Sequence, residues 1–88
     1  MKVPLYSYRD TLVGFGTPIV DINDQTAIRG FSMQMNNPSS MNNFSPKDFD
    51  LYRIGVYETD TGLIEPETVP ILICNGTSVI GVNNEKNK

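Results

Sequence analysis

The side chains that could carry acid–base or metal chemistry in this chain form three closely spaced pairs of carboxylates. The pairs are Asp48 with Asp50, Glu58 with Asp60, and Glu65 with Glu67. Paired carboxylates can bind a cation or divide the roles of general acid and general base between them. Each pair here falls on an expected strand edge or turn, where solvated carboxylates are ordinary. The pairs therefore give no specific support for catalysis.

Nucleophilic chemistry is limited by the lack of histidine and by a single cysteine. Without His, the chain has no His-based catalytic triad and no His metal ligand. Cys74 lies in the apolar run PILICNG and has no second cysteine with which to form a disulfide within the chain. We expect a buried, unreactive thiol at this position. The sequence predicts a non-enzymatic protein with no metal or other cofactor.

The length and charge of the chain restrict its organisation and its partners. Its 88 residues allow one layered core, which we assign to residues 1–82, followed by a polar tail at 83–88. A net charge of −3 argues against binding to duplex DNA through a broad basic surface. No apolar run approaches the about 20 residues that span a bilayer, so no membrane partner is expected. A core this small leaves apolar area and strand edges exposed, which predicts a homo-oligomer, most simply a two-fold dimer.

The strongest local pattern predicts an amphipathic helix from Asp24 to Met35. Asn23 or Asp24 can cap its start, and Pro38 disfavours helical geometry at the residue before it. The apolar stripe of this helix consists of Ala27, Ile28, Phe31 and Met35. Such a stripe must pack against another element.

The other segments read mainly as strands. KVPLYSYRD alternates between two sides, LVGFGTPIV is extended but interrupted by glycines and a proline, and SPKD predicts one short helical turn. In DLYRIGVYE, Tyr52, Ile54 and Val56 form an apolar side, and residues 51, 53, 55 and 57 form a mixed side. TDTG is a turn, and LIEPETVPILIC returns as a further strand. The sequence predicts an α+β fold: a small, mostly antiparallel sheet of about four strands with one amphipathic helix packed on one face.

Several blocks of the chain resemble one protein family. FGTPIV, TAIRGF, PKDFDLYRIGVYETDTGLI and VPILICNG resemble, in order, the blocks of the small nonstructural protein of gokushovirus-type microviruses, tailless phages with circular single-stranded DNA. The most specific block consists of Pro46, Asp48, Phe49, Leu51, Tyr52 and Gly55. The resemblance covers most of residues 5–76, while Gly30 interrupts the helix block and the tail extends beyond it.

The resemblance implies a non-enzymatic, DNA-binding protein made in the cytoplasm of the infected bacterial host and kept out of the mature capsid shell. Such a protein acts in replication of the single-stranded genome or in its packaging. Aromatic and Arg side chains on one sheet face can stack bases without a large positive charge. The candidates for binding single-stranded DNA are Tyr6, Tyr8, Arg9, Arg29, Tyr52, Arg53 and Tyr57.

Alternatives stay open at each level. The tyrosines can instead pack the sheet with their hydroxyls at its rim. The protein can instead be an adaptor that binds the phage replication initiator or a host replication protein, or a structural component of assembly. A binding assay with single-stranded DNA separates the first role from the adaptor, and analysis of purified virions tests the last.

Overall fold

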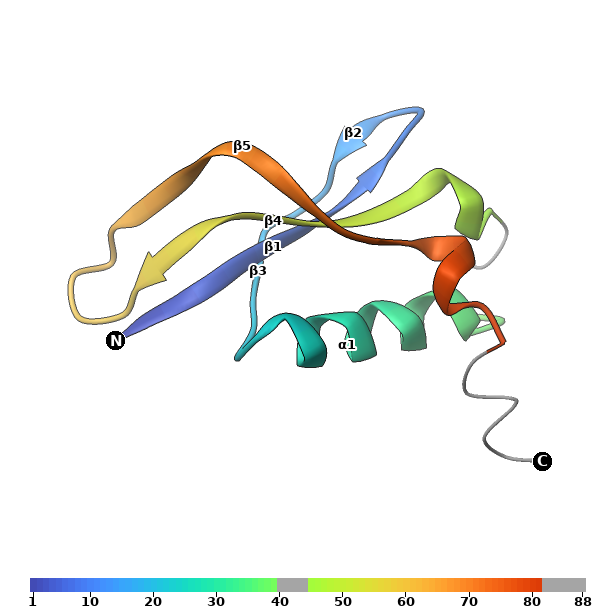
Figure 1. The fold of residues 1–88 in the computed structure, drawn as a ribbon, viewed down its shortest axis with the longest axis horizontal. Helices are drawn as coiled ribbons and strands as arrows, with labels where there is room; N and C mark the ends of the chain where they lie inside the picture. Colours follow the sequence, from blue (N-terminus) through green and yellow to red (C-terminus); the bar gives the residue numbers. More distant parts are fainter. Residues whose placement is uncertain (40–44, 82–88) are drawn as a thin grey trace.

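A computed structural model describes residues 1–39 and 45–81 and shows a curled antiparallel sheet with one α-helix across one of its faces (Figure 1). This arrangement confirms the predicted α+β class. The polar tail predicted at 83–88, together with residue 82, lies outside the described residues.

The sheet consists of β1 (Lys2–Asp10), β2 (Gly14–Phe15), β3 (Ile19–Val20), β4 (Phe49–Glu58) and β5 (Ile64–Asn75). The strand order is β2-β1-β4-β5, and β3 pairs with β1 beyond β2. The segment predicted as one second strand thus forms two short strands, β2 and β3, which both pair with β1 on the side away from β4. Between them, the Gly16 N–H donates to the Tyr8 carbonyl at 2.8 Å and holds the segment against β1.

Helix α1 (Asp24–Asn36) begins at the predicted residue and ends one residue beyond the predicted Met35. Asn23 caps it, because its side-chain oxygen accepts from the Thr26 N–H at 2.9 Å while the Thr26 hydroxyl accepts from the Asn23 N–H at 3.3 Å. This reciprocal pair satisfies two backbone donors that a helix start otherwise leaves free. The residue before Pro38 is extended, with φ −82° and ψ 114°, which ends the helix.

The core lies between α1 and the inner face of the sheet. Its buried apolar members are Tyr6, Ala27, Phe31, Met35, Leu51 and Val79. Two short 3-10 helices, η2 (Pro46–Asp48) and η3 (Gly76–Val79), close one end of it. Asn36 fastens this end, because its amide donates to the Val79 carbonyl at 2.9 Å and its oxygen accepts from the Gly81 N–H at 2.8 Å.

The orientation of β4 differs from the prediction. Leu51, from the side predicted to be mixed, is fully buried beneath the helix, whereas Tyr52 lies on the opposite face of the sheet. The alternation also breaks at Ile54, because Tyr6 pairs with Arg53 and Leu5 pairs with Gly55. A bulge of this kind reverses the faces of the residues beyond it. Apolar content alone therefore did not identify the side that faces the core.

Candidate nucleic-acid interface

The two faces of the sheet are distinguished by the residues of β1. The Tyr8 ring meets the Phe31 ring of α1 edge-on, with centroids 4.9 Å apart, so Tyr6 and Tyr8 face the helix. Alternation along a strand places Ser7 and Arg9 on the other side, which we call the outer face. The helix does not cover this face.

Three side chains from three strands meet on the outer face. Phe15 pairs with Arg9 across β1 and β2, and its ring lies edge-on to that of Tyr52, with centroids 5.3 Å apart and an interplanar angle of 71°. The Arg9 guanidinium carbon lies 5.9 Å from the centre of the Phe15 ring, within the range of a cation–π contact. We call these three residues the aromatic patch. Phe15 is 48% exposed, so part of its ring is open to a ligand.

The aromatic patch is positioned by backbone contacts of the segment that carries Phe15. The buried Ser7 hydroxyl donates to the Gly16 carbonyl at 2.9 Å, which fixes this segment against β1. On the neighbouring strand, Asp50 pairs with Arg9 and accepts from the Asn75 amide at 2.6 Å. An acidic neighbour reduces the attraction of Arg9 for phosphate, so the patch suits stacking better than charge neutralisation.

The structure corrects the assignment of Tyr6 as a residue that binds DNA. Tyr6 is fully buried in the core, and its hydroxyl donates to Asp24 Oδ1 at 2.5 Å. Burial, and next the hydrogen bond to Asp24, raise the pKa of the Tyr6 hydroxyl. No ring face of Tyr6 is available to a base. This tyrosine packs the sheet, as the alternative interpretation of the tyrosines proposed.

Arg53 is likewise engaged within the protein. Its Nη1 lies 3.3 Å from Asp24 Oδ1 and its Nε lies 3.3 Å from Glu67 Oε2, so it links α1 to β5. Two carboxylates on one guanidinium leave little positive charge for a phosphate. Arg53 therefore joins the helix to the sheet in this structure, and its contact with DNA stays a prediction.

Tyr57 and Arg29 lie away from the aromatic patch. Tyr57 pairs with Val3 near the far end of β4, about 17 Å from Tyr52 along the strand at about 3.3 Å per residue. Arg29 is exposed on α1, the element that covers the opposite face. Of the seven predicted residues, the structure brings together Arg9 and Tyr52.

Phe15 is the member of the patch that sequence reasoning missed. It lies between two glycines in a two-residue strand, a context that shows no alternating pattern. A signal was present in the flanking glycines, since Gly in a strand often marks a bulge or the close approach of a neighbouring strand. Only the pairing of β2 with β1 identifies that neighbour.

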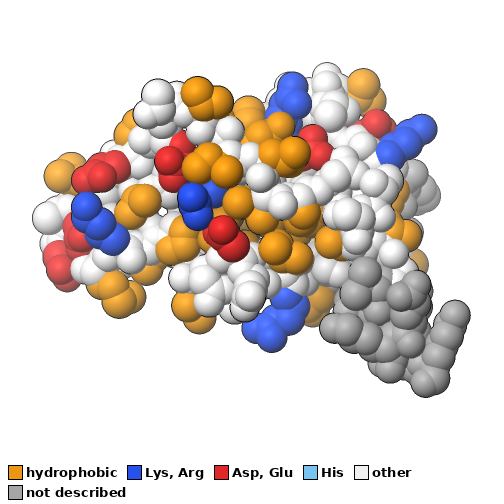
Figure 2. All heavy atoms as spheres, viewed as in Figure 1, with side chains coloured by type: hydrophobic (Ala, Val, Ile, Leu, Met, Phe, Trp, Pro, Cys, Tyr) orange, Lys and Arg blue, Asp and Glu red, His pale blue; other side chains and the backbone are white. Residues whose placement is uncertain are grey.

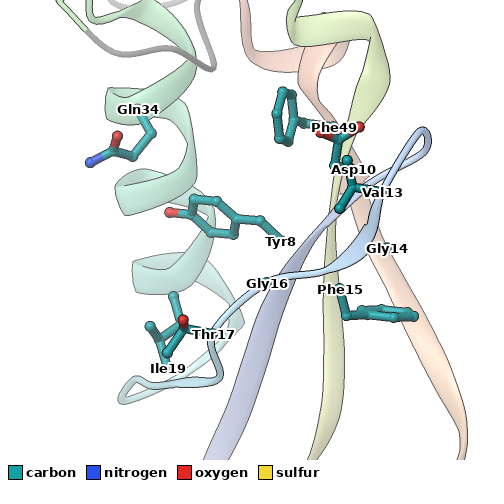
Figure 3. Close-up of a pocket in the computed structure, with 10 residues that line it drawn as sticks. All are labelled: Tyr8, Asp10, Val13, Gly14, Phe15, Gly16, Thr17, Ile19, Gln34 and Phe49. Carbon is teal, nitrogen blue, oxygen red and sulfur yellow. The ribbon is translucent and has the colours of Figure 1, made fainter.

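Tyr8 lies in a groove on the inner side of the same sheet edge (Figure 3). The groove runs between α1 and the segment after β1, and has a volume of about 560 Å³. Its lining residues are Tyr8, Asp10, Val13, Gly14, Phe15, Gly16, Thr17, Ile19, Gln34 and Phe49. Burial raises the pKa of the Tyr8 hydroxyl. None of these ten residues is Lys or Arg, so they offer no positive charge for a phosphate.

Each carboxylate of the three pairs has a partner in the structure. Asp48 accepts from the Ser45 hydroxyl and Asp50 from Asn75, while Glu65 lies 3.6 Å from Lys2 and Glu67 pairs with Arg53. Glu58 and Asp60 contact the amino group of Met1 at 2.5 and 2.9 Å. Among residues 1–39 and 45–81, no group of three or more Asp, Glu, Cys or His side chains is placed to hold a metal ion. These carboxylates serve turns and ion pairs.

Positive charge is not gathered into a patch on the face drawn in Figure 2. Figure 2 shows Lys and Arg side chains scattered singly among acidic and apolar ones on the face drawn there. No helix within the described part of the chain is long and apolar enough to cross a membrane.

The fold and the aromatic patch define a small α+β domain with an open sheet face that carries aromatic side chains. A family model for the Phage ORF5 protein matches residues 3–79. The chain belongs to this family, which confirms the expectation of a small bacteriophage protein. No curated protein and no solved structure matches the chain.

Proposed function

We propose that this chain is a non-enzymatic phage accessory protein that binds single-stranded DNA weakly through the aromatic patch. Its role is in replication or packaging of the single-stranded genome of a gokushovirus-type microvirus, in the cytoplasm of the infected bacterium. The observation that carries the proposal is the cluster of Arg9, Phe15 and Tyr52 on the sheet face that the helix leaves uncovered.

Stacking supplies the free energy of binding in this proposal. A base that stacks on an aromatic side chain contributes about 1–3 kcal/mol, and every base has a flat face. The edge-on pair of Phe15 and Tyr52 offers ring surface of this kind, and Arg9 adds one positive charge beside it. Duplex DNA keeps its bases stacked on one another and binds less well.

The charge distribution predicts a shallow dependence on salt. If each chain contacts one or two phosphates, the slope of log K against log salt is about −0.7 to −1.4 for a single strand. Fluorescence anisotropy of a labelled single strand, measured at several salt concentrations, gives this slope. An absence of binding at low salt refutes the proposal, and a steep slope shows that phosphate contacts dominate over stacking.

Matched aromatic substitutions test the location of the site. We expect Tyr52→Leu and Phe15→Leu each to weaken binding about fivefold or more, because each removes a flat ring from the patch. Tyr57→Leu removes a comparable ring from the far end of β4 and leaves the affinity unchanged. Circular dichroism of each variant checks that the fold is retained. Equal losses in all three variants contradict the assignment of the patch.

A protein adaptor is the second candidate function. It is favoured by the exposed apolar side chains at the start and middle of β5 and in the turn before it, such as Leu63, Ile64 and Val69, which are 67%, 57% and 70% exposed. In this case the chain binds the phage replication initiator or a host replication protein, and single-stranded DNA produces no anisotropy change. Detection of the chain in purified virions would instead support a structural role in assembly.

A further inference from the structure

The sequence from Thr11 to Val20 contains no charged residue and exposes large apolar side chains along one edge of the sheet. The exposed fractions are 82% for Leu12 and 86% for Val13 at the turn after β1, and 40% and 51% for Ile19 and Val20 in β3. Single exposed apolar residues are ordinary, but a continuous uncharged segment with this exposure indicates an interaction surface.

The turn that presents Leu12 is held in place by three hydrogen bonds. The Val13 N–H donates to the Asp10 carbonyl at 3.1 Å, and the Leu12 N–H donates to Asp10 Oδ1 at 2.9 Å. The Thr11 N–H donates to the Asp48 carbonyl at 2.9 Å, which fastens the turn to η2. The Leu12 side chain is thus presented from an ordered backbone. An ordered binding element loses less entropy when it docks.

A receptor for such a side chain lies on the same edge of the sheet. It is the groove of Figure 3, about 560 Å³ in volume, which Tyr8, Ile19 and Phe49 line with apolar surface and whose rim Val13 forms. Among the described residues that line it, Asp10 is the only charged one, and one of its carboxylate oxygens already accepts from the turn. The groove therefore suits an uncharged, apolar side chain.

We propose that the chain forms a two-fold dimer in which the Leu12 side chain of each copy lies in the groove of the other. The turn and the groove are neighbours on one edge, so a two-fold axis beside that edge brings each turn to the partner's groove. The same pair of surfaces is then used twice, and the assembly closes at two copies.

The opposite edge of the sheet is poorly suited to self-association. Strand β5 carries Glu65 and Glu67, and two copies paired there would bring these carboxylates together. Pro66 and Pro70 cannot donate to a strand ladder, and the register of β5 with β4 is irregular between Arg53 and Gly55. The uncharged edge is therefore the one that a second copy covers.

The groove used by this dimer shares Phe15 with the aromatic patch. In Figure 3 the Phe15 ring points away from Tyr8 and from the helix. Phe15 also contributes to the lining of the groove, whereas Arg9 and Tyr52 do not, so a partner in the groove covers at most the Phe15 side of each patch.

Sedimentation equilibrium from about 1 to 100 µM tests the proposal, the range in which a modest interface associates. We expect a dimer for the natural chain and a dimer at least about tenfold weaker for Leu12→Ser, which removes the inserted side chain, and for Thr17→Trp, which fills the groove. Leu63→Ser is the control, because Leu63 is 67% exposed in the turn between β4 and β5. It leaves the dimer intact, and thermal melts show that all variants are folded.

A cross-linking experiment tests the contact itself. Leu12→Cys and Thr17→Cys are prepared separately, each with Cys74→Ser, and are mixed under mild oxidation. The expected product is a disulfide between the two different proteins, formed faster than in either protein alone. A monomer at all concentrations overturns the proposal, as does a dimer that withstands both Leu12→Ser and Thr17→Trp.

Discussion

Replacement of Tyr6 by Phe tests the polar contact that joins the first turn of the helix to the sheet. The Tyr6 hydroxyl donates to Asp24 Oδ1 at 2.5 Å, and Asp24 also lies 3.3 Å from Arg53 Nη1. Tyr6→Phe keeps the buried ring and removes only this hydrogen bond. The core packing is unchanged, so the loss of stability measures the contact.

The magnitude follows from the burial of the two partners. A hydrogen bond to a charged group contributes about 1.5–3 kcal/mol to the free energy of unfolding. The Asp24 side chain is 42% exposed and is partly solvated by water after the change, which places the expected loss at the lower end, about 1.5 kcal/mol. A loss of 1 kcal/mol lowers Tm by about 4–8 °C in a domain of this size, so Tm falls by about 6–12 °C.

Urea denaturation at pH 7, followed by far-UV circular dichroism, measures this loss. The control is Tyr8→Phe, because the Tyr8 hydroxyl makes no hydrogen bond within the described residues, and its expected loss is under about 0.5 kcal/mol. A double-mutant cycle of Tyr6→Phe with Asp24→Asn gives a coupling of about 0.5 kcal/mol or more. Equal losses in the two tyrosine variants, together with zero coupling, refute the reasoning.

Three further predictions concern the closed end of the core, the helix cap and the thiol. Gly76→Ala destabilises the fold by about 3 kcal/mol in thermal melts, because an added Cβ would lie 1.9 Å from the Pro46 carbonyl oxygen. Gly30→Ala stabilises the fold by up to about 1 kcal/mol, because apart from the adjacent backbone of the helix itself no atom lies within 4 Å of the added Cβ. Asn23→Ala removes the helix cap and lowers the free energy of unfolding by about 1 kcal/mol in urea, with an unchanged m value. Burial raises the pKa of the Cys74 thiol from 9.0 to about 11, so alkylation of the native chain is slow at pH 8 and accelerates toward pH 11. The contribution of this thiol to the free energy of unfolding is fully present below pH 9.0 and declines between pH 9.0 and about 11. Cys74 is half-buried rather than fully buried as the sequence predicted, and alkylation at pH 8 as fast as in the unfolded chain contradicts this partial burial.

The helix and its boundaries could be predicted from the sequence because their causes are local. The apolar spacing of Ala27, Phe31 and Met35 defines the buried stripe, Asn23 and Thr26 satisfy each other's backbone donors, and the proline after Asn37 forces an extended residue. All of these interactions act within a few residues. The α+β class followed in the same way, because a single amphipathic helix among strands must cover a sheet.

The candidate site could be predicted only in part. Arg9 and Tyr52 were identified from their side-chain chemistry, and the structure brings them together. Tyr6 was identified by the same reasoning, yet it is buried. Residue type does not distinguish these tyrosines, because the same ring and hydroxyl suit both a core and a binding surface.

Tertiary structure decided which face of each strand is covered. A strand presents its two sides with equal regularity, and the sequence of β4 favoured the side of Tyr52, whereas the helix packs on the side of Leu51. The position of Phe15 beside Arg9 depends on the pairing of β1 with a two-residue strand, which has no periodicity of its own. Helical spacing and capping are set by near neighbours along the chain, whereas burial in a sheet is set by the strands and helix that pack against it.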